Sequence, residues 1–248
     1  MNSTRGFTLI EILVAVAVSM IMLSVIGIAI NTMQKSSAGI ERKVTAQQDV
    51  RAALELMAME IRMASYNPTV ATDAAIWRNT DCTFPATYPQ YRGIQGATTN
   101  AITVEMDISD GLGGDGNGLI MSSAAETNEI ISYNYVSTGG EEYLTRQTNC
   151  GGAQPFLGDL STSGNPRTVR VRNAALNIPI FRYFDGQGNL MPVDASGNIL
   201  NAGTQIPNIR MIEITLAVQT DEIDPSTKQR RDMIYSTREV LRNHIAIQ

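Results

Sequence analysis

The sequence predicts an α+β protein in which one long N-terminal helix, first transmembrane and then amphipathic, packs on an antiparallel β-sheet domain. From residue 7 to residue 66 the apolar side chains are either continuous or spaced at helical intervals of three and four residues. Beyond Pro68 they alternate with a period of two, which is typical of strands. These patterns divide the chain into a transmembrane helix half at 7–31, an amphipathic helix half at 32–66 and an extracytoplasmic β domain at 67–248.

The first helix half is long and apolar enough to cross a membrane. No charged residue occurs between Glu11 and Lys35, and the apolar run over 12–30 covers most of the ~30 Å of a bilayer's hydrocarbon. The run is followed by further helical pattern and not by the small-residue cleavage site of a secretory signal peptide. We therefore expect the segment to stay in the membrane, with Arg5 on the cytoplasmic side and the chain after about Asn31 outside the cytoplasm.

The second helix half is amphipathic. Its apolar positions form one stripe with spacings of four, three, four and three residues: Val50, Leu54, Met57, Ile61 and Ala64. Its charged side chains are predicted to lie mainly off that stripe: Asp49, Arg51, Glu55, Glu60 and Arg62. Such a face packs on a sheet, whereas a helix on the bilayer surface would carry mainly basic charge. Gly39 is a weak point, and Asn67-Pro68 predicts the end of the helix.

Six segments of the remaining chain are predicted as antiparallel strands: 102–108, 129–136, 168–172, 178–184, 209–219 and 233–241. Segments rich in Gly, Asp, Asn and Pro predict turns at 110–118, 139–140, 151–152, 163–166, 185–188 and 224–226. Residues 221–228 are predicted as a hairpin loop, and the strands on either side of it as the centre of the sheet. No internal repeat is evident.

The composition disfavours several classes of function. Lys and Arg number 19 against 24 Asp and Glu, giving a net charge of −5, and they are scattered, so nucleic acid is not an expected partner. Two distant cysteines and one histidine exclude a zinc-finger site. The histidine, His244, lies in the terminal segment, and no nucleophile elbow, phosphate loop or HExxH motif occurs. We therefore expect a protein that is not an enzyme.

The segment Gly6-Phe7-Thr8-Leu9-Ile10-Glu11 resembles the cleavage and methylation motif of type IV prepilins and type II secretion pseudopilins. The resemblance implies a pilin-like fold and a prepilin peptidase that removes residues 1–6 as a leader. Cleavage would fall between Gly6 and Phe7, followed by methylation of the new Phe7 amine. The resemblance also implies that Glu11, the fifth residue of the mature chain, pairs with the Phe7 amine of a neighbouring subunit.

Simple electrostatics favours that pairing. An isolated carboxylate in hydrocarbon is costly, and an opposite charge buried beside it offsets much of the desolvation penalty. The alternative is an uncleaved signal anchor, in which Glu11 lies close enough to the headgroups to reach water.

Weaker motifs farther along the chain are similar, in order and spacing, to the PilW family of minor pilins. They are Leu144-Thr145-Arg146, Gly151-Gly152-Ala153-Gln154-Pro155, Phe181-Arg182-Tyr183-Phe184-Asp185, Ile209-Arg210 and Val240-Leu241-Arg242-Asn243. Each motif on its own is explained by a structural role. Arg146 and Arg242 would end strands, and the aromatic residues would lie in the core or in cross-strand pairs. The apolar segment has no proline, which is more typical of pseudopilins and some minor pilins than of major pilins.

The resemblance implies a minor pilin of a type IV pilus. Its precursor would sit in the inner membrane with the C-terminal domain in the periplasm, and would then enter the pilus at the cell surface as a subunit of the initiation or tip complex. The implied partners are the prepilin peptidase, the inner-membrane assembly platform, and other minor and major pilins. The alternatives are a J-like pseudopilin of type II secretion, a membrane-tethered adhesin or binding protein, and a tethered enzyme.

The two cysteines are predicted to pair. Cys82 and Cys150 would face an oxidising compartment, where a disulfide forms readily and would stabilise the domain by about 4 kcal/mol in the chain-entropy model. Two buried free thiols are the alternative.

Calcium is the one candidate ligand, and no other cofactor is expected. The oxygen-bearing residues Asp107, Asp110, Asp115 and Asn117 lie in a turn-rich stretch of the kind that binds hard cations. However, an EF-type loop starting at Asp115 would place Leu119 and Ile120 where an oxygen ligand and a glycine belong. The alternative is a hairpin loop with solvated carboxylates.

Overall fold

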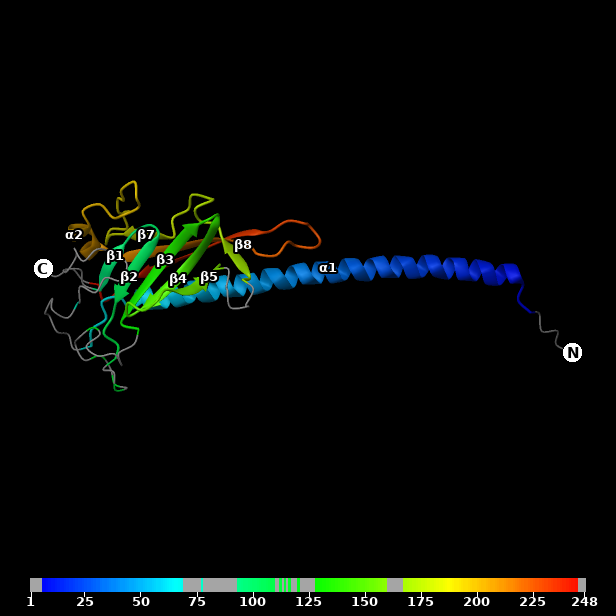
Figure 1. Cartoon of the computed structure of the whole chain (residues 1–248), viewed down its shortest axis with the longest axis horizontal. Coiled ribbons are helices and arrows are strands. Elements are labelled where there is room, and N and C mark those ends of the chain that lie inside the picture. Colours follow the sequence, from blue (N-terminus) through cyan, green and yellow to red (C-terminus); the bar gives the residue numbers. More distant parts are fainter. Residues whose placement is uncertain are drawn as a thin grey trace.

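The chain forms one long helix that projects from a β domain, as the computed structural model shows in Figure 1. The structure describes residues 6–68, 77, 93–109, 112, 114, 116, 120, 128–159 and 167–244. Helix α1 (Leu9–Arg62) comes first, and antiparallel strands follow it. This arrangement confirms the predicted α+β, pilin-like architecture.

Helix α1 begins and ends with recognisable caps. Thr8 is the N-cap in extended geometry, and Met63 is the C-cap, with its N–H donating to the carbonyls of Glu60 and Ile61. The helix therefore ends before Asn67-Pro68, one turn earlier than predicted. Ser65 then adopts a positive φ of 65°, and Gly93 lies so close that a Cβ there would be 2.2 Å from Ser65. The close approach joins the helix end to the start of the first strand.

The two halves of α1 have opposite surroundings. Every described residue from Gly6 to Ser37 is exposed, whereas buried positions begin at Ala46. The predicted stripe is confirmed, because all five of its apolar residues are buried: Val50, Leu54, Met57, Ile61 and Ala64. The β domain thus covers only the C-terminal half of the helix, and the apolar half extends free of it (Figure 1).

One sheet contains five antiparallel strands in the order β1-β2-β3-β4-β5. Their bounds are β1 (Ile94–Ala97), β2 (Ala101–Glu105), β3 (Ile130–Thr138), β4 (Glu141–Thr148) and β5 (Gln154–Leu157). Gly139 and Gly140 connect β3 to β4, and both have positive φ values, 62° and 83°, as a tight two-residue hairpin turn requires. This confirms the predicted turn.

The second sheet is built around β8 (Met211–Thr220). Strand β9 (Asp232–Val240) pairs along nearly all of one edge of β8. Strands β6 (Val169–Val171) and β7 (Phe181–Phe184) pair with opposite ends of the other edge. The prediction that both final strands lie centrally is therefore right for β8, while β9 pairs with no strand other than β8 within the described residues.

Helix α1 packs against β8, β9 and β5, and the core lies between the helix and the two sheets. The sheets also meet directly, since β6 contacts β4 and β5, and the Tyr183 hydroxyl donates to the Thr98 carbonyl at 2.7 Å. A short helix α2 (Ala202–Gln205) and the 3₁₀ turn η2 (Ile206–Asn208) connect β7 to β8.

Some strands escaped prediction, and although a turn was predicted at 185–188, its repetition at 194–198 was not. Strands β1, β4 and β5 are absent from the predicted set, because their exposure does not follow a simple alternation. Residues 185–189 and 194–198 share the pattern Asp-x-x-Gly-Asn. In each, the aspartate accepts from the N–H groups two and four residues on and from the asparagine side chain.

The loop between β8 and β9 extends back along α1 toward its apolar half (Figure 1). Arg42 on the helix donates to the Ile223 carbonyl at 3.0 Å and forms an ion pair with Glu222 at 2.6 Å. Gly39 faces Asp224 so closely that a Cβ there would be 2.8 Å from the carboxylate. Gly39, predicted as a weak point, thus provides the space in which the loop packs on the helix.

Candidate assembly site

The predicted cleavage bond lies in an accessible stretch of chain. Gly6, Phe7 and Thr8 precede the helix and are non-helical, and the Phe7 side chain is 86% exposed. A Cβ at Gly6 would meet no heavy atom within 4 Å. Together these features leave the Gly6–Phe7 bond open to a peptidase.

Glu11 lies in the first turn of α1 and is held by its own chain. Its Oε2 atom accepts hydrogen bonds from the Thr8 backbone N–H at 2.8 Å and from the Thr8 hydroxyl at 2.9 Å. The Thr8 Oγ1 in turn accepts from the Glu11 N–H at 3.4 Å, which completes a capping box. The positive end of the helix dipole favours a carboxylate at this position.

Sequence reasoning singled out Glu11 and missed Thr8. The signal was present, because a threonine followed three residues later by a glutamate, ahead of an apolar run, is the capping-box pattern. The structure therefore brings together Gly6, Phe7, Thr8 and Glu11 at one helix end. Within a single chain, the partner of the Glu11 carboxylate is Thr8, a neutral hydrogen-bond donor.

Three hydroxyl side chains in and directly after the apolar half also form hydrogen bonds within the helix. The hydroxyls of Ser19, Ser24 and Thr32 each donate to the carbonyl four residues earlier, at 2.7 to 2.9 Å. Such bonds let hydroxyl groups enter hydrocarbon without an unsatisfied donor. Among the described residues, α1 is the one helix whose length and composition suffice to cross a membrane.

Glu60 was predicted among the charged side chains that lie mainly off the buried stripe, but it points into the core. Its carboxylate accepts from Arg146 on β4, with Nη2–Oε1 at 2.5 Å and Nε–Oε2 at 3.1 Å, and also from the Tyr133 hydroxyl. Arg146 lies within β4 and not at a strand end, so that prediction is wrong as well. Burial and the nearby Glu60 carboxylate raise the pKa of Tyr133 well above its ordinary value.

His244 has a structural position and not a catalytic one. Its Nδ1 atom lies 2.8 Å from the Ser65 hydroxyl and its Nε2 atom 2.9 Å from the Ile206 carbonyl. The ring is 1% exposed, and it ties the end of the chain to the end of α1 and to η2. Neither ring nitrogen is therefore available to orient a nucleophile.

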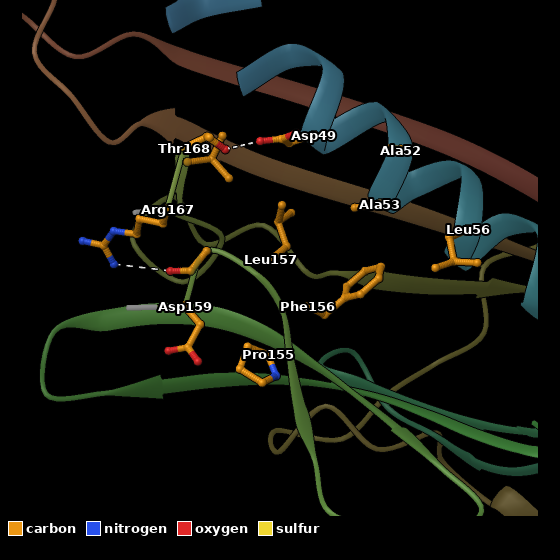
Figure 2. A pocket seen from close by; sticks show the side chains of 12 residues that line it. Asp49, Ala52, Ala53, Leu56, Pro155, Phe156, Leu157, Asp159, Arg167 and Thr168 are labelled. Atoms are coloured by element: carbon orange, nitrogen blue, oxygen red, sulfur yellow. Dashed lines mark hydrogen bonds between the residues drawn. The ribbon is translucent and has the colours of Figure 1, made fainter. Parts of the chain in front are cut away.

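Figure 2 shows an open groove where α1 faces β5 and the start of β6. Its walls are largely apolar, with Ala53 and Leu56 on the helix opposite Phe156 and Leu157. Several polar groups at one end are paired: the Thr168 hydroxyl donates to Asp49, and Arg167 donates to the Gly158 carbonyl and to carboxylates of Glu141 and Asp221. Thr168, Asp49 and Arg167 are thus engaged in hydrogen bonds within the fold.

The calcium prediction stays open. Asp107 is buried, and Gly116 packs on it so tightly that a Cβ there would be 2.1 Å from the carboxylate. Asp110, Asp115 and Asn117 lie outside the described residues. Among the residues that the structure does describe, no group of three His, Cys, Asp or Glu side chains could hold a metal ion.

The disulfide also stays a prediction. Cys150 follows β4 in a turn with a positive φ of 56°, and Cys82 lies outside the described residues.

Comparison with known proteins gives one match, at the N-terminus. A family model described as the prokaryotic N-terminal methylation motif matches residues 1–27. Comparison with curated proteins gave no match, and comparison with solved structures gave none.

The match indicates a type IV pilin-like or pseudopilin precursor, and such a motif marks a structural protein. It implies association with other pilins and with a prepilin peptidase, and together with the apolar helix it is consistent with anchoring in the inner membrane.

Proposed function

We propose that this protein is a minor pilin of a type IV pilus, similar to the PilW family. A prepilin peptidase cuts the precursor between Gly6 and Phe7 and methylates the Phe7 amine. The mature chain waits in the inner membrane with its β domain in the periplasm, and the assembly platform then moves it into the initiation or tip complex of a pilus. The observation that carries the proposal is the capped, exposed helix start that coincides with the matched methylation motif.

The arrangement supports a two-stage role for Glu11. In the membrane-bound precursor, Thr8 supplies two hydrogen bonds that reduce the cost of holding a carboxylate near hydrocarbon. During assembly, the methylated Phe7 amine of a neighbouring subunit comes close and offers a full positive charge. The charged partner binds the carboxylate more strongly than a neutral donor does, so Glu11 selects a processed neighbour.

Mass spectrometry of the mature N-terminus tests the processing step. The expected chain begins at N-methylated Phe7, and an intact Met1 would contradict the proposal. Glu11→Ala should be cut normally but be depleted from sheared pili, while Glu55→Ala, an exposed acid on the same helix, should be incorporated normally. Equal incorporation of the two variants would refute the role given to Glu11.

A J-like pseudopilin of type II secretion is the second candidate, because the unbroken helix is typical of pseudopilins as well as of some minor pilins. Helix α1 continues without interruption through a proline-free apolar half. Deleting the gene separates the two, since loss of surface pili supports the first function and loss of secreted enzymes supports the second. A membrane-tethered adhesin would instead keep its leader and bind its target without entering a filament.

A further inference from the structure

The loop between β8 and β9 encloses an open pocket where it packs against α1 (Figure 1). The pocket has a volume of about 460 Å³, and we call it the loop pocket. Most of its lining side chains carry hydrogen-bond donors: Lys43 and Gln47 on the helix, and Thr227, Gln229, Arg230 and Arg231 on the loop. The helix and the loop thus present donors to one shared space.

The loop pocket is positively charged, although the chain as a whole carries −5. Three cations line it, Lys43, Arg230 and Arg231, against one described carboxylate, Asp232, which leaves a net charge of +2. The Asp232 Oδ1 atom accepts a hydrogen bond from the Gln219 side chain at 3.0 Å. The lining therefore suits an anion.

The other acidic side chains of the loop do not neutralise these cations completely. Glu222 forms an ion pair with Arg42 at 2.6 Å. Asp221 forms one with Arg167 at 2.9 Å. Both carboxylates are thus matched by arginines that do not line the loop pocket.

Each of the three cations keeps donors for a ligand. Arg231 contacts the Asp224 carboxylate through Nη2 at 3.2 Å. Arg230 donates through Nε to the Asp221 backbone carbonyl at 2.8 Å, and this acceptor is uncharged. Lys43 forms no ion pair within the part of the chain that the structure describes. The positive charge of the pocket is therefore only partly balanced by the protein itself.

The loop is held in shape by its own hydrogen bonds. The Asp224 carboxylate accepts from the Ser226 N–H at 2.8 Å and from the Ser226 hydroxyl at 2.6 Å. The Asp224 carbonyl accepts from the Lys228 N–H at 2.8 Å, and the Asp224 N–H donates to the Gln229 carbonyl at 3.0 Å. A ligand would therefore meet donors that are already in place, which lowers the entropic cost of binding.

We propose that the loop pocket binds a phosphate group. Phosphate carries one or two negative charges on several acceptor oxygens, and it matches the forked guanidinium group of arginine together with the compact charge of lysine. A carboxylate has only two oxygens and one charge, so it would engage fewer of the donors that converge here. The inference goes beyond the proposed function and does not depend on it.

The phosphate group could belong to a lipid headgroup or to a soluble molecule. Lys43 follows the end of the apolar run at Ile30 by thirteen residues, which is about 20 Å along a helix. The headgroup layer extends only about 5–8 Å beyond the hydrocarbon on each side. The distance therefore favours a soluble molecule that carries phosphate.

Calorimetric titration of the full-length chain in an uncharged detergent tests the proposal, with inorganic phosphate and pyrophosphate as the probes at an ionic strength of about 0.15 M. We expect saturable binding of one probe molecule per chain. Lys43→Gln should weaken it about tenfold or more, because a charged hydrogen-bond donor is lost. Lys228→Gln is the matched control, since it removes the same charge from an exposed residue of the loop that does not line the pocket.

A second arm distinguishes the two sources of phosphate. The chain is placed in phosphatidylcholine bilayers with or without phosphatidylglycerol and titrated with the same probes. If phosphatidylglycerol blocks the probes, and Lys43→Gln abolishes this competition, the pocket takes a lipid headgroup. If the probes bind equally well in both bilayers, it takes phosphate from a soluble molecule. Either result supports a phosphate site.

Two results would overturn the proposal. One is the absence of saturable binding in detergent and in both bilayers. The other is an equal loss of affinity in Lys43→Gln and Lys228→Gln, which would mean that the probes respond to charge in general. Urea midpoints verify that the variants stay folded, and Lys43→Gln should keep the wild-type midpoint because Lys43 forms no ion pair with the described residues.

Discussion

Replacing Glu60 by glutamine tests whether the buried ion pair holds α1 on the five-stranded sheet. The Glu60 and Arg146 side chains are 9% and 24% exposed, and two hydrogen bonds join them. The Tyr133 hydroxyl donates to the same carboxylate. The substitution keeps the shape of residue 60 but leaves the half-buried Arg146 charge without an opposite charge beside it.

The size of the effect follows from these contacts. Removing one partner of a buried ion pair costs about 3–5 kcal/mol. Water reaches part of the Arg146 side chain, and glutamine retains one acceptor oxygen, so we expect the free energy of unfolding to fall by about 2–3 kcal/mol. With a urea dependence of about 2 kcal/mol/M, the unfolding midpoint should fall by about 1–1.5 M. The domain should stay folded in buffer, because a typical domain has about 5–15 kcal/mol of stability.

Urea unfolding of the full chain in detergent measures this change, with the fluorescence of Trp77, the only tryptophan, as the probe. Glu55→Gln on the exposed face of the helix is the control, expected within about 0.5 kcal/mol of the wild type. The triple variant Glu60→Met, Tyr133→Phe, Arg146→Met removes the charges and the hydroxyl together and should lose less than Glu60→Gln. If Glu60→Gln matches the Glu55→Gln control, the reasoning about this ion pair is wrong.

Four further predictions concern other parts of the molecule. Replacing a glycine by alanine within a helix normally stabilises the helix by about 1 kcal/mol. Gly39→Ala should instead lower the urea midpoint, because the new Cβ displaces Asp224. A raised midpoint would contradict the packing of the loop on the helix. Burial and a hydrogen bond to Glu142 raise the pKa of Tyr135 to about 12. Its unfolded pKa is about 10, so its contribution to stability is present below pH 10 and is lost as the pH rises toward 12. Ultraviolet titration compared with Tyr135→Phe checks this, and a normal tyrosine pKa would refute it. Periplasmic protein should migrate differently with and without reductant, and Cys150→Ser should abolish the difference; no difference in the wild type would mean free thiols. If calcium binds the aspartate-rich stretch, chelation should lower the melting temperature of the purified chain, and an unchanged value would favour a solvated loop.

The N-terminal part of the molecule could be predicted from local sequence. The uncharged run after Glu11 and the helical spacing from Val50 to Ala64 each depend on residues close together in the chain, and both appear as expected in α1. Of the two strands that Gly139-Gly140 connects, only β3 was predicted. The turn and β3 matched a simple pattern, whereas β4 carries polar residues on both faces and was missed.

The partners of polar residues could not be predicted in the same way. Glu60 looks like a surface charge in the sequence, and it is buried because Arg146, 86 residues away, reaches it from β4. His244 likewise joins Ser65 across 179 residues. No local pattern encodes such contacts, because they arise only when the sheets have paired and brought distant segments together.

The sequence by itself therefore determined the membrane-compatible helix, its methylation motif and the α+β class, since these follow from composition and periodicity within short windows. Only the tertiary structure decided that Thr8 caps Glu11, that Glu60 turns inward, and that Lys43 and Arg230 line one pocket. Burial and hydrogen bonding are properties of the folded surroundings of a residue, and the folded surroundings of α1 change from open to enclosed along a single continuous helix.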